Sequence, residues 1–266
     1  MKKSISKIYI GLIFLFLYAP ILVLIVNSFN LSKNRAKFTG FSLKWYPELF
    51  KDSEIMAALF NTLTIALIAS IIATILGTVA ALAITKFKRR TRSVVMNVTY
   101  IPVISPEIVT GISLMLLFVF FSKAFGLEQG FITVLIAHIT FCVPYVILNV
   151  LPKLRQMDDS IYEAALDLGC PPAKAFIKVV IPEILPGIIS GFLMAFTFSL
   201  DDFVITYFTS GTGFQTLPVA IYSMTRRRVS PKINALSTIM FIVILLVLIL
   251  MNVTDSKKSK KTKLKM

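Results

Sequence analysis

The segment FITVLIAHITFCVPYVILNVL, residues 131–151, decides the fold class of this chain. It holds one histidine, His138, and no Asp, Glu, Lys or Arg, over about the 20 apolar residues that a helix needs to cross a bilayer. We therefore predict a transmembrane helix here. The whole chain has a mean hydropathy of +0.83 and 56% hydrophobic residues, more apolar side chain than a water-soluble surface could hide.

Similar apolar stretches lie on both sides of this segment and predict an all-α polytopic membrane protein with six transmembrane helices. The first stretch could instead be a cleaved signal peptide, because Lys2 and Lys3 precede it. We interpret it as a retained helix, since its apolar run is too long and lacks a clear small-x-small cleavage site. The six predicted spans are approximately 8–29, 55–84, 94–121, 131–151, 184–208 and 233–253.

The domain organisation follows from these spans. We predict an N-terminal helix and outer loop over 1–54, a membrane core over 55–253 with a cytoplasmic loop at 152–182, and a basic tail over 254–266. The tail contains mainly Lys, Ser and Thr, which is typical of a solvated or lipid-headgroup segment.

The basic residues indicate an orientation in the membrane. The net charge is +15, which in a soluble protein would suggest nucleic acid, but here the Lys and Arg residues lie between apolar runs. With the N-terminus inside, 18 of the 28 Lys and Arg residues fall on the cytoplasmic side, as the positive-inside rule favours. Two outside segments oppose this count, residues 33–51 and the run Arg226 to Arg228. We predict that both termini are cytoplasmic.

Few residues could support catalysis or metal binding. Cys142 lies in an apolar run, Cys170 lies in a loop, and His138 is the one histidine, so neither a disulfide framework nor a zinc site is expected. The sequence has no P-loop, so any ATP hydrolysis belongs to a partner and this chain is not expected to be an enzyme. A self-sufficient secondary transporter remains an alternative, although it would need no coupling loop and we see no inverted repeat.

The loop 152–182 has the chemistry of a capped helix. Ser160 and Glu163 have the S-x-x-E spacing of a capping box, residues 158–159 are acidic at a favourable helix start, and Gly169 is a natural terminator. One side of this helix carries small and apolar residues that would allow close approach by another surface: Ile161, Ala164, Ala165 and Leu168.

A second helical stretch follows in the same loop. Pro171 and Pro172 break the chain, and residues 173–180 are expected to be helical until Ile181 and Pro182 end the helix before the next span. An ordinary cytoplasmic helix-turn-helix would also fit this pattern.

The loop resembles the EAA loop of binding-protein-dependent ABC importer permeases, whose pattern is E-A-A-x3-G-x9-I-x-L-P. The spacing matches throughout, with Val for Ile and Ile for Leu as the departures. The resemblance implies an ABC transmembrane type-1 fold and a coupling helix that sits in a groove of the ATP-binding subunit. The matching residues are Glu163, Ala164, Ala165, Gly169, Val179, Ile181 and Pro182.

A wider resemblance links nearly the whole chain to the PotC-type permeases of spermidine/putrescine ABC importers, although the run Arg226 to Arg228 departs from that pattern. It implies a bacterial inner-membrane location, a second homologous permease, an ATP-binding subunit dimer that uses ATP and Mg, and an external polyamine-binding protein. A permease for another small solute is the alternative. The matching stretches are 27–30, 40–41, 44–46, 138–142, 199–202, 217–218, 221–224 and 229–231.

Three acidic residues fall inside predicted spans, where each needs a polar partner, a wet cavity or an interfacial position. Asp201 and Asp202 lie about 100° apart on a helix, so we expect one to face the substrate pathway and the other a neighbouring helix. Family resemblance favours Asp202 for the pathway. Glu107 could line the pathway or favour a restarted helix at Ser105-Pro106. Tyr207 could hold cationic substrate through its ring.

His138 lies in the middle of the fourth span without a carboxylate neighbour in sequence. A histidine at such a site is more often hydrogen-bonded for structural reasons than a proton relay, so we interpret it as structural.

Overall fold

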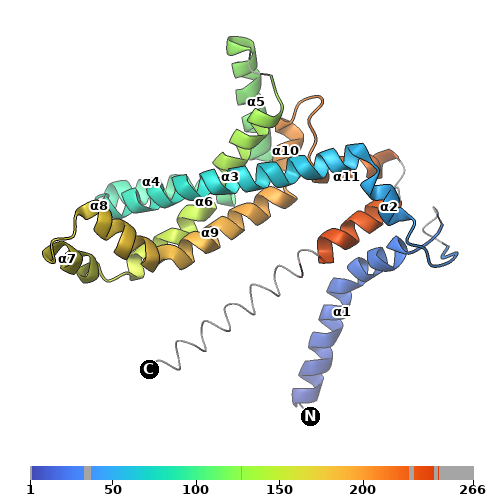
Figure 1. Ribbon diagram of the computed structural model, residues 1–266, viewed down its shortest axis with the longest axis horizontal. Helices are drawn as coiled ribbons and strands as arrows, with labels where there is room; N and C mark the ends of the chain where they lie inside the picture. Colours follow the sequence, from blue (N-terminus) through green and yellow to red (C-terminus); the bar gives the residue numbers. More distant parts are fainter. Residues whose placement is uncertain (1, 33–36, 127, 228–230, 243–244, 246–266) are drawn as a thin grey trace. The chain divides into compact units, whose positions relative to one another are not determined.

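The computed structural model describes residues 2–32, 37–126, 128–227, 231–242 and 245 (Figure 1). Within these residues the regular elements are helices, with one isolated β-bridge between Asn30 and Phe41, so the predicted all-α class is confirmed. The helices are α1 (Lys2–Ser28), α2 (Trp45–Phe50), α3 (Ser53–Lys86), α4 (Arg89–Ile104), α5 (Glu107–Phe125), α6 (Phe131–Gln156), α7 (Asp159–Asp167), α8 (Pro172–Ala175), the π-helix η1 (Phe176–Val180), α9 (Ile181–Asp201), α10 (Val204–Thr209) and α11 (Leu217–Arg227).

Five helical segments of the described residues are long and apolar enough to cross a membrane, which confirms a polytopic membrane protein. They are Tyr9–Ser28, Ser53–Lys86, Glu107–Phe125, Phe131–Gln156 and Pro172–Asp201. Residues 231–242 are also helical and open the predicted sixth span, whose remainder lies largely outside the described residues. The basic tail and Arg228 lie outside them as well.

Two predicted spans are wrong as continuous helices. The stretch 94–121 is divided between α4 and α5, because Ser105 is extended and Pro106 lacks the N–H that would continue the helix. The stretch 184–208 is divided between α9 and α10, since the backbone at Asp202 is extended. Both breaks place an acidic residue at a helix end.

The chain divides into two compact units, one formed by Met1–Met56 with Ile221–Met266 and the other by Ala57–Ala220. In the first unit, polar contacts fix the segment after α1. The Trp45 indole N–H donates to the Asn30 carbonyl at 2.6 Å, and the Ser28 and Tyr46 hydroxyls lie 2.8 Å apart. Trp45 is buried, so it does not serve as the lipid-facing interfacial anchor that its ring would otherwise suggest.

The second unit is built on close backbone packing around Val146 of α6. A Cβ added at Gly191 of α9 would meet the Val146 side chain at 3.2 Å, and one at Gly77 of α3 would meet it at 2.6 Å. Small residues of this kind let helices in lipid approach closely, where van der Waals packing replaces the hydrophobic effect. In Figure 1, α7 and α8 lie at one end of α6 and α9, while α10 lies at the other end.

Candidate functional site

Asp158 is the N-cap of the helix α7, and its carboxylate accepts a hydrogen bond from the Ser160 backbone N–H at 3.0 Å. The predicted capping box of Ser160 with Glu163 is therefore wrong, because the N-cap lies two residues earlier. The hydrogen bonds from Ser160 lower the pKa of Asp158, since they favour its charged form. The Glu163 side chain is exposed, so it is available for contacts outside this chain.

The end of α7 is a left-handed glycine turn. Gly169 has a φ of +78°, which side chains other than glycine rarely adopt. Its N–H donates to Leu166 at 2.8 Å, and the Cys170 N–H donates to the Ala165 carbonyl at 3.1 Å. These bonds satisfy carbonyls that the helix end would leave unpaired, so the predicted terminator is confirmed.

One side of α7 is apolar and uncovered among the described residues. Leu168 is 89% exposed and Ile161 49% exposed, and Ala164 beside them is also exposed. The opposite side carries Tyr162 and Leu166, which are partly buried. A helix with an uncovered apolar stripe and short side chains is suited to insertion into a complementary groove.

The second stretch of the loop does not end where the sequence predicts. Residues Pro172–Asp201 form one continuous helical run, in which η1 joins α8 to α9. Within it, the Ile181 N–H bonds to the Phe176 carbonyl, five residues back, so the wider π turn carries the chain past Pro182, which has no N–H. The loop is thereby connected directly to the core helix α9.

A buried polar network joins α6 to the break between α9 and α10. The His138 ring lies 2.6 Å from the Ser199 hydroxyl through Nδ1 and 2.9 Å from the Thr206 hydroxyl through Nε2. The Thr206 hydroxyl donates to Asp202 Oδ2 at 2.8 Å, so its oxygen accepts from His138 Nε2–H. His138 Nδ1 and the Ser199 hydroxyl pair with one another, so each hydroxyl and both ring nitrogens have a hydrogen-bond partner.

Asp202 also forms the start of α10. Its Oδ1 accepts from the Ile205 backbone N–H at 3.2 Å and its Oδ2 from the Thr206 backbone N–H at 2.8 Å. His138 Nε2 lies 3.3 Å from Oδ2, and both side chains are almost completely buried. Every oxygen of this carboxylate is engaged within the protein. His138 is hydrogen-bonded as the sequence predicts, and its carboxylate neighbour lies at the break between α9 and α10.

The neighbouring Asp201 has different surroundings. It is the last residue of α9 and is exposed, whereas Asp202 is buried, so the two carboxylates do not share one environment. Tyr207 is 47% exposed, and its ring lies 5.4 Å from that of Phe203. The geometry therefore favours Asp201 over Asp202 as the carboxylate available to a solute.

Glu107 is the first residue of α5. This position agrees with one of the two interpretations of Glu107, a helix that restarts at Ser105-Pro106. Glu107 is exposed, and the Pro106 carbonyl accepts from the Val109 N–H at 2.9 Å to start the helix. Glu107 interacts electrostatically with Tyr145 of α6, whose ring lies 4.5 Å from that of Phe198. The sequence did not single out Tyr145, and its one signal is the position after the helix-internal Pro144.

Among the described residues, no group of three or more His, Cys, Asp and Glu side chains could hold a metal ion. The free thiols Cys142 and Cys170 are separate, one buried and one half-buried.

Comparisons with known proteins agree on one family. The family described as "Binding-protein-dependent transport system inner membrane component" matches residues 73–257. The putrescine transport system permease protein PotI of Escherichia coli (strain K12) is 46% identical over 230 residues, covering 85% of this chain and 82% of PotI. The spermidine/putrescine transport system permease protein PotC of Haemophilus influenzae is 37% identical over 237 residues, covering 89% of this chain and 91% of PotC.

Solved structures agree in fold. A bacterial ABC transporter involved in the import of the acidic polysaccharide alginate has a TM-score of 0.69 at 15% identity, covering 96% of this chain and 95% of that chain. The same kind of transporter in complex with an alginate pentasaccharide-bound periplasmic protein gives 0.67 at 17% identity, covering 94% and 91%. The resemblance deduced from the loop and its flanking motifs is confirmed, and the chain belongs to the family of binding-protein-dependent transport system inner membrane components.

Proposed function

We propose that this chain is one permease subunit of an ATP-driven importer whose substrate is a polyamine such as spermidine or putrescine. The observation that carries the substrate class is the 46% identity over 230 residues to a permease named for putrescine. The chain has no P-loop, so ATP and Mg would bind to a separate ATP-binding subunit dimer. A second homologous permease and an external polyamine-binding protein would complete the assembly.

Exposed carboxylates at helix breaks would provide the negative charge that a cationic solute needs. Ammonium groups lose water on entering a membrane, and carboxylates and aromatic faces can offset that loss. Asp201 and Tyr207 offer these two groups on either side of the break between α9 and α10. Asp202 was the residue favoured by family resemblance, but its fully engaged oxygens support a structural role, and we assign the pathway role to Asp201.

Glu107 supplies a second carboxylate on the proposed pathway. It stands at the start of α5, within electrostatic range of Tyr145, whose ring is tilted at 57° against that of Phe198 with the ring centroids 4.5 Å apart. The methylene stem of a polyamine can lie against these rings while an ammonium group faces the carboxylate.

The α7 loop is the proposed coupling element. Its exposed Glu163 and Ala164 and its exposed terminator Gly169 would contact the ATP-binding subunit. Ala165 and Pro182 would hold this surface, because Ala165 accepts the hydrogen bond that closes the glycine turn and Pro182 lies where the loop passes into α9. Movement of the loop would thus reach α9 and its Asp201 through one helical run.

The proposed orientation places both termini and α7 in the cytoplasm. Cysteine labelling at Ser32 and Ser259 should report opposite sides of the membrane, with Ser259 inside. Labelling of Ser259 from outside would overturn both the orientation and the coupling role of the loop.

The decisive experiment uses the complex purified with its co-expressed neighbours and reconstituted in lipid. Spermidine or putrescine with the binding protein should stimulate ATP hydrolysis and drive uptake. Stimulation by a different small solute, with none by polyamines, would show that the proposed substrate class is wrong and would leave the proposed importer function intact. Uptake that needs no ATP-binding subunit would contradict the importer itself.

A further inference from the structure

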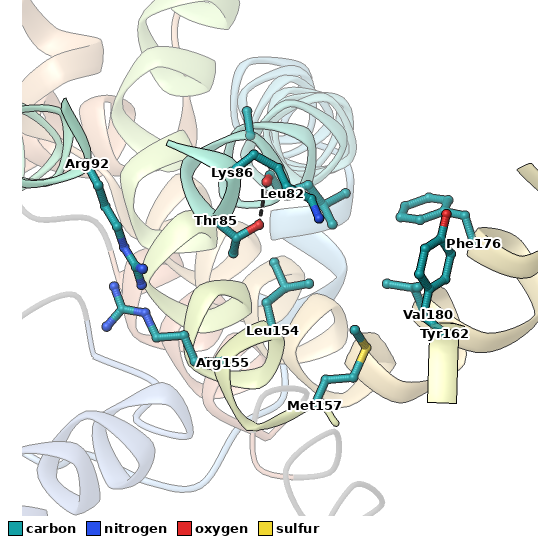
Figure 2. Close-up of a pocket in the computed structure, with 11 residues that line it drawn as sticks. Leu82, Thr85, Lys86, Arg92, Leu154, Arg155, Met157, Tyr162, Phe176 and Val180 are labelled. Atoms are coloured by element: carbon teal, nitrogen blue, oxygen red, sulfur yellow. Dashed lines mark hydrogen bonds between the residues drawn. The ribbon is translucent and has the colours of Figure 1, made fainter. Parts of the chain in front are cut away.

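A basic cavity of about 580 Å³ opens at the α7 end of the second unit (Figure 2). The ends of α3 and α6, the start of α4, and side chains of α7 and η1 enclose it. Its polar members include Lys86, Arg92 and Arg155, and its apolar members include Leu154, Phe176 and Val180. None of these residues belongs to the proposed pathway or to the exposed face of α7.

The cavity is positively charged and holds no counter-charge from the described side chains. Three of its lining residues are Lys or Arg and none is Asp or Glu. The ion pairs between Lys or Arg and acidic residues in the described part of the chain lie elsewhere, at Lys44 with Glu48 and at Lys232 with Asp52. Figure 2 shows the guanidinium groups of Arg92 and Arg155 turned toward one another. Like charges placed in this way repel unless an anion lies between them.

The same cavity is apolar on its other side. Leu82, Leu154, Phe176 and Val180 line it, and Val180 and Leu154 are buried. Inorganic phosphate would gain nothing from this apolar wall, because water hydrates it on all sides. A lipid presents a phosphate next to its glycerol and acyl chains, so its shape matches a site with cations on one side and aliphatic and aromatic groups on the other.

We propose that this cavity binds the phosphate headgroup of an anionic phospholipid, with Arg92 and Arg155 as its principal ligands and Lys86 as a third cation. Basic pockets between helices at the cytoplasmic end of membrane proteins commonly hold such headgroups. Guanidinium groups suit this role because their planar fork donates two parallel hydrogen bonds to phosphate oxygens. A bound lipid would join the first turn of α4 to the end of α6 beside the α7 loop. The inference does not depend on the transported substrate.

The test compares two charge-matched double variants of the complete complex. The first variant, Arg92→Gln with Arg155→Gln, removes both guanidinium ligands. The second variant, Arg89→Gln with Arg90→Gln, removes two exposed arginines at the start of α4 that do not line the cavity. Native mass spectrometry would count retained phosphatidylglycerol and cardiolipin, with phosphatidylcholine as the neutral probe. Each basic residue that contacts an anionic lipid raises the affinity about fivefold, so losing both guanidinium ligands should lower anionic-lipid affinity roughly thirtyfold in the first variant. The second variant should retain its lipid.

Each alternative outcome is distinct. Equal lipid retention by the two variants would overturn the proposal. Binding of inorganic phosphate at the same site, with the same dependence on Arg92 and Arg155, would identify a free anion as the occupant. That result would overturn the proposed lipid site. Loss of the ATP-binding subunit from the Arg92 and Arg155 variant, with lipid retention unchanged, would identify an acidic protein surface instead.

Discussion

The two ends of α9 differ in how they are held. At its N-terminal end, α7 is stabilised by neighbours in sequence, the Asp158 cap and the Gly169 turn. At its C-terminal end, the break before α10 is stabilised by residues far away in sequence, because His138 contacts Ser199 and Thr206 across separations of 61 and 68 residues. The cap and glycine turn of α7 are exposed, whereas the His138 network is buried.

This difference separates function from folding. A change in α7 disturbs one turn and leaves the core of α6 and α9 in place. A change in the His138 network leaves buried polar groups unpaired where no water can replace the lost partner. We therefore expect variants at the α7 end to lose activity while retaining structure, and variants at the network to lose structure first.

The largest expected effect is at Asp202. In Asp202→Asn the amide nitrogen replaces an acceptor with donors that face the donating N–H groups of Ile205 and Thr206, or leaves one N–H unsatisfied after rotation. We expect the free energy of unfolding to fall by about 2 to 3 kcal/mol, because a buried group is left unsatisfied and a charged partner is removed. The measurement is the thermal midpoint and the yield of assembled complex in detergent.

Asp201→Asn is the matched control for this variant, since it makes the same chemical change one residue away at an exposed carboxyl. Its midpoint should stay close to that of the parent. Equal destabilisation by both variants would break the contrast between the two ends of α9.

The next effect is at Gly169. Gly169→Leu forces a branched side chain into a left-handed turn, which costs roughly 1 to 2 kcal/mol and reshapes the exposed surface of α7. We expect normal membrane insertion with transport lowered at least about tenfold, consistent with a loss of 1.4 kcal/mol or more in coupling. Polyamine-stimulated ATPase activity and uptake are measured together.

Gly126→Leu provides the control, because Gly126 also has a left-handed φ, +71°, and open space around it, but ends α5 instead of α7. It should show similar strain with transport retained. Glu163→Ala adds a variant without strain, since Glu163 is exposed and does not cap the helix. Full coupling in Gly169→Leu would remove the coupling role from this loop.

A smaller effect is expected in Asp201→Asn on transport itself. Its carboxylate is exposed at the end of α9, so neutralising it removes charge that offsets ammonium desolvation, and Glu107 remains as a second carboxylate. Spermidine uptake should fall several-fold, by less than about tenfold, at normal complex yield. Asp201→Glu, which restores the charge, should recover most of the uptake. Normal uptake in Asp201→Asn would dismiss this residue from the pathway.

The sequence was a good guide to features whose signals are local. Long apolar runs predicted the spans, and the spacing from Glu163 to Pro182 predicted the loop and its family. Gly169 was recognisable as a terminator, because the requirement for a left-handed turn depends only on that residue and its neighbours.

The parts that the sequence did not predict depend on distant partners. The role of Asp202 required knowing that His138 and Thr206 meet it in space. Tyr145 and Phe198 are likewise separated along the chain, and only the packing of α6 against α9 brings their rings to 4.5 Å. The break at Asp202 was missed, and the break at Pro106 was predicted only as one of two interpretations of Glu107. Hydropathy continues through both positions, and the partners of the freed backbone groups decide where a helix stops.

The smallest expected effect asks whether long-range contact or burial makes the network important. Lys232 donates to Asp52 at 2.8 Å across 180 residues, so this pair is long-range like the network, but its side chains keep 26% and 22% of their surface exposed. The hydrogen bond from Lys232 lowers the pKa of Asp52 below its ordinary value of 3.8. Because the folded-state pKa is depressed, the stabilisation is complete above 3.8 and is lost as the pH falls through the lower folded-state value. Solvent screening limits this stabilisation to below about 1 kcal/mol.

Asp52→Asn should therefore lower the thermal midpoint slightly at pH 7 and become indistinguishable from the parent in strong acid. A loss as large as that of Asp202→Asn would mean that sequence separation, and not burial, sets the cost.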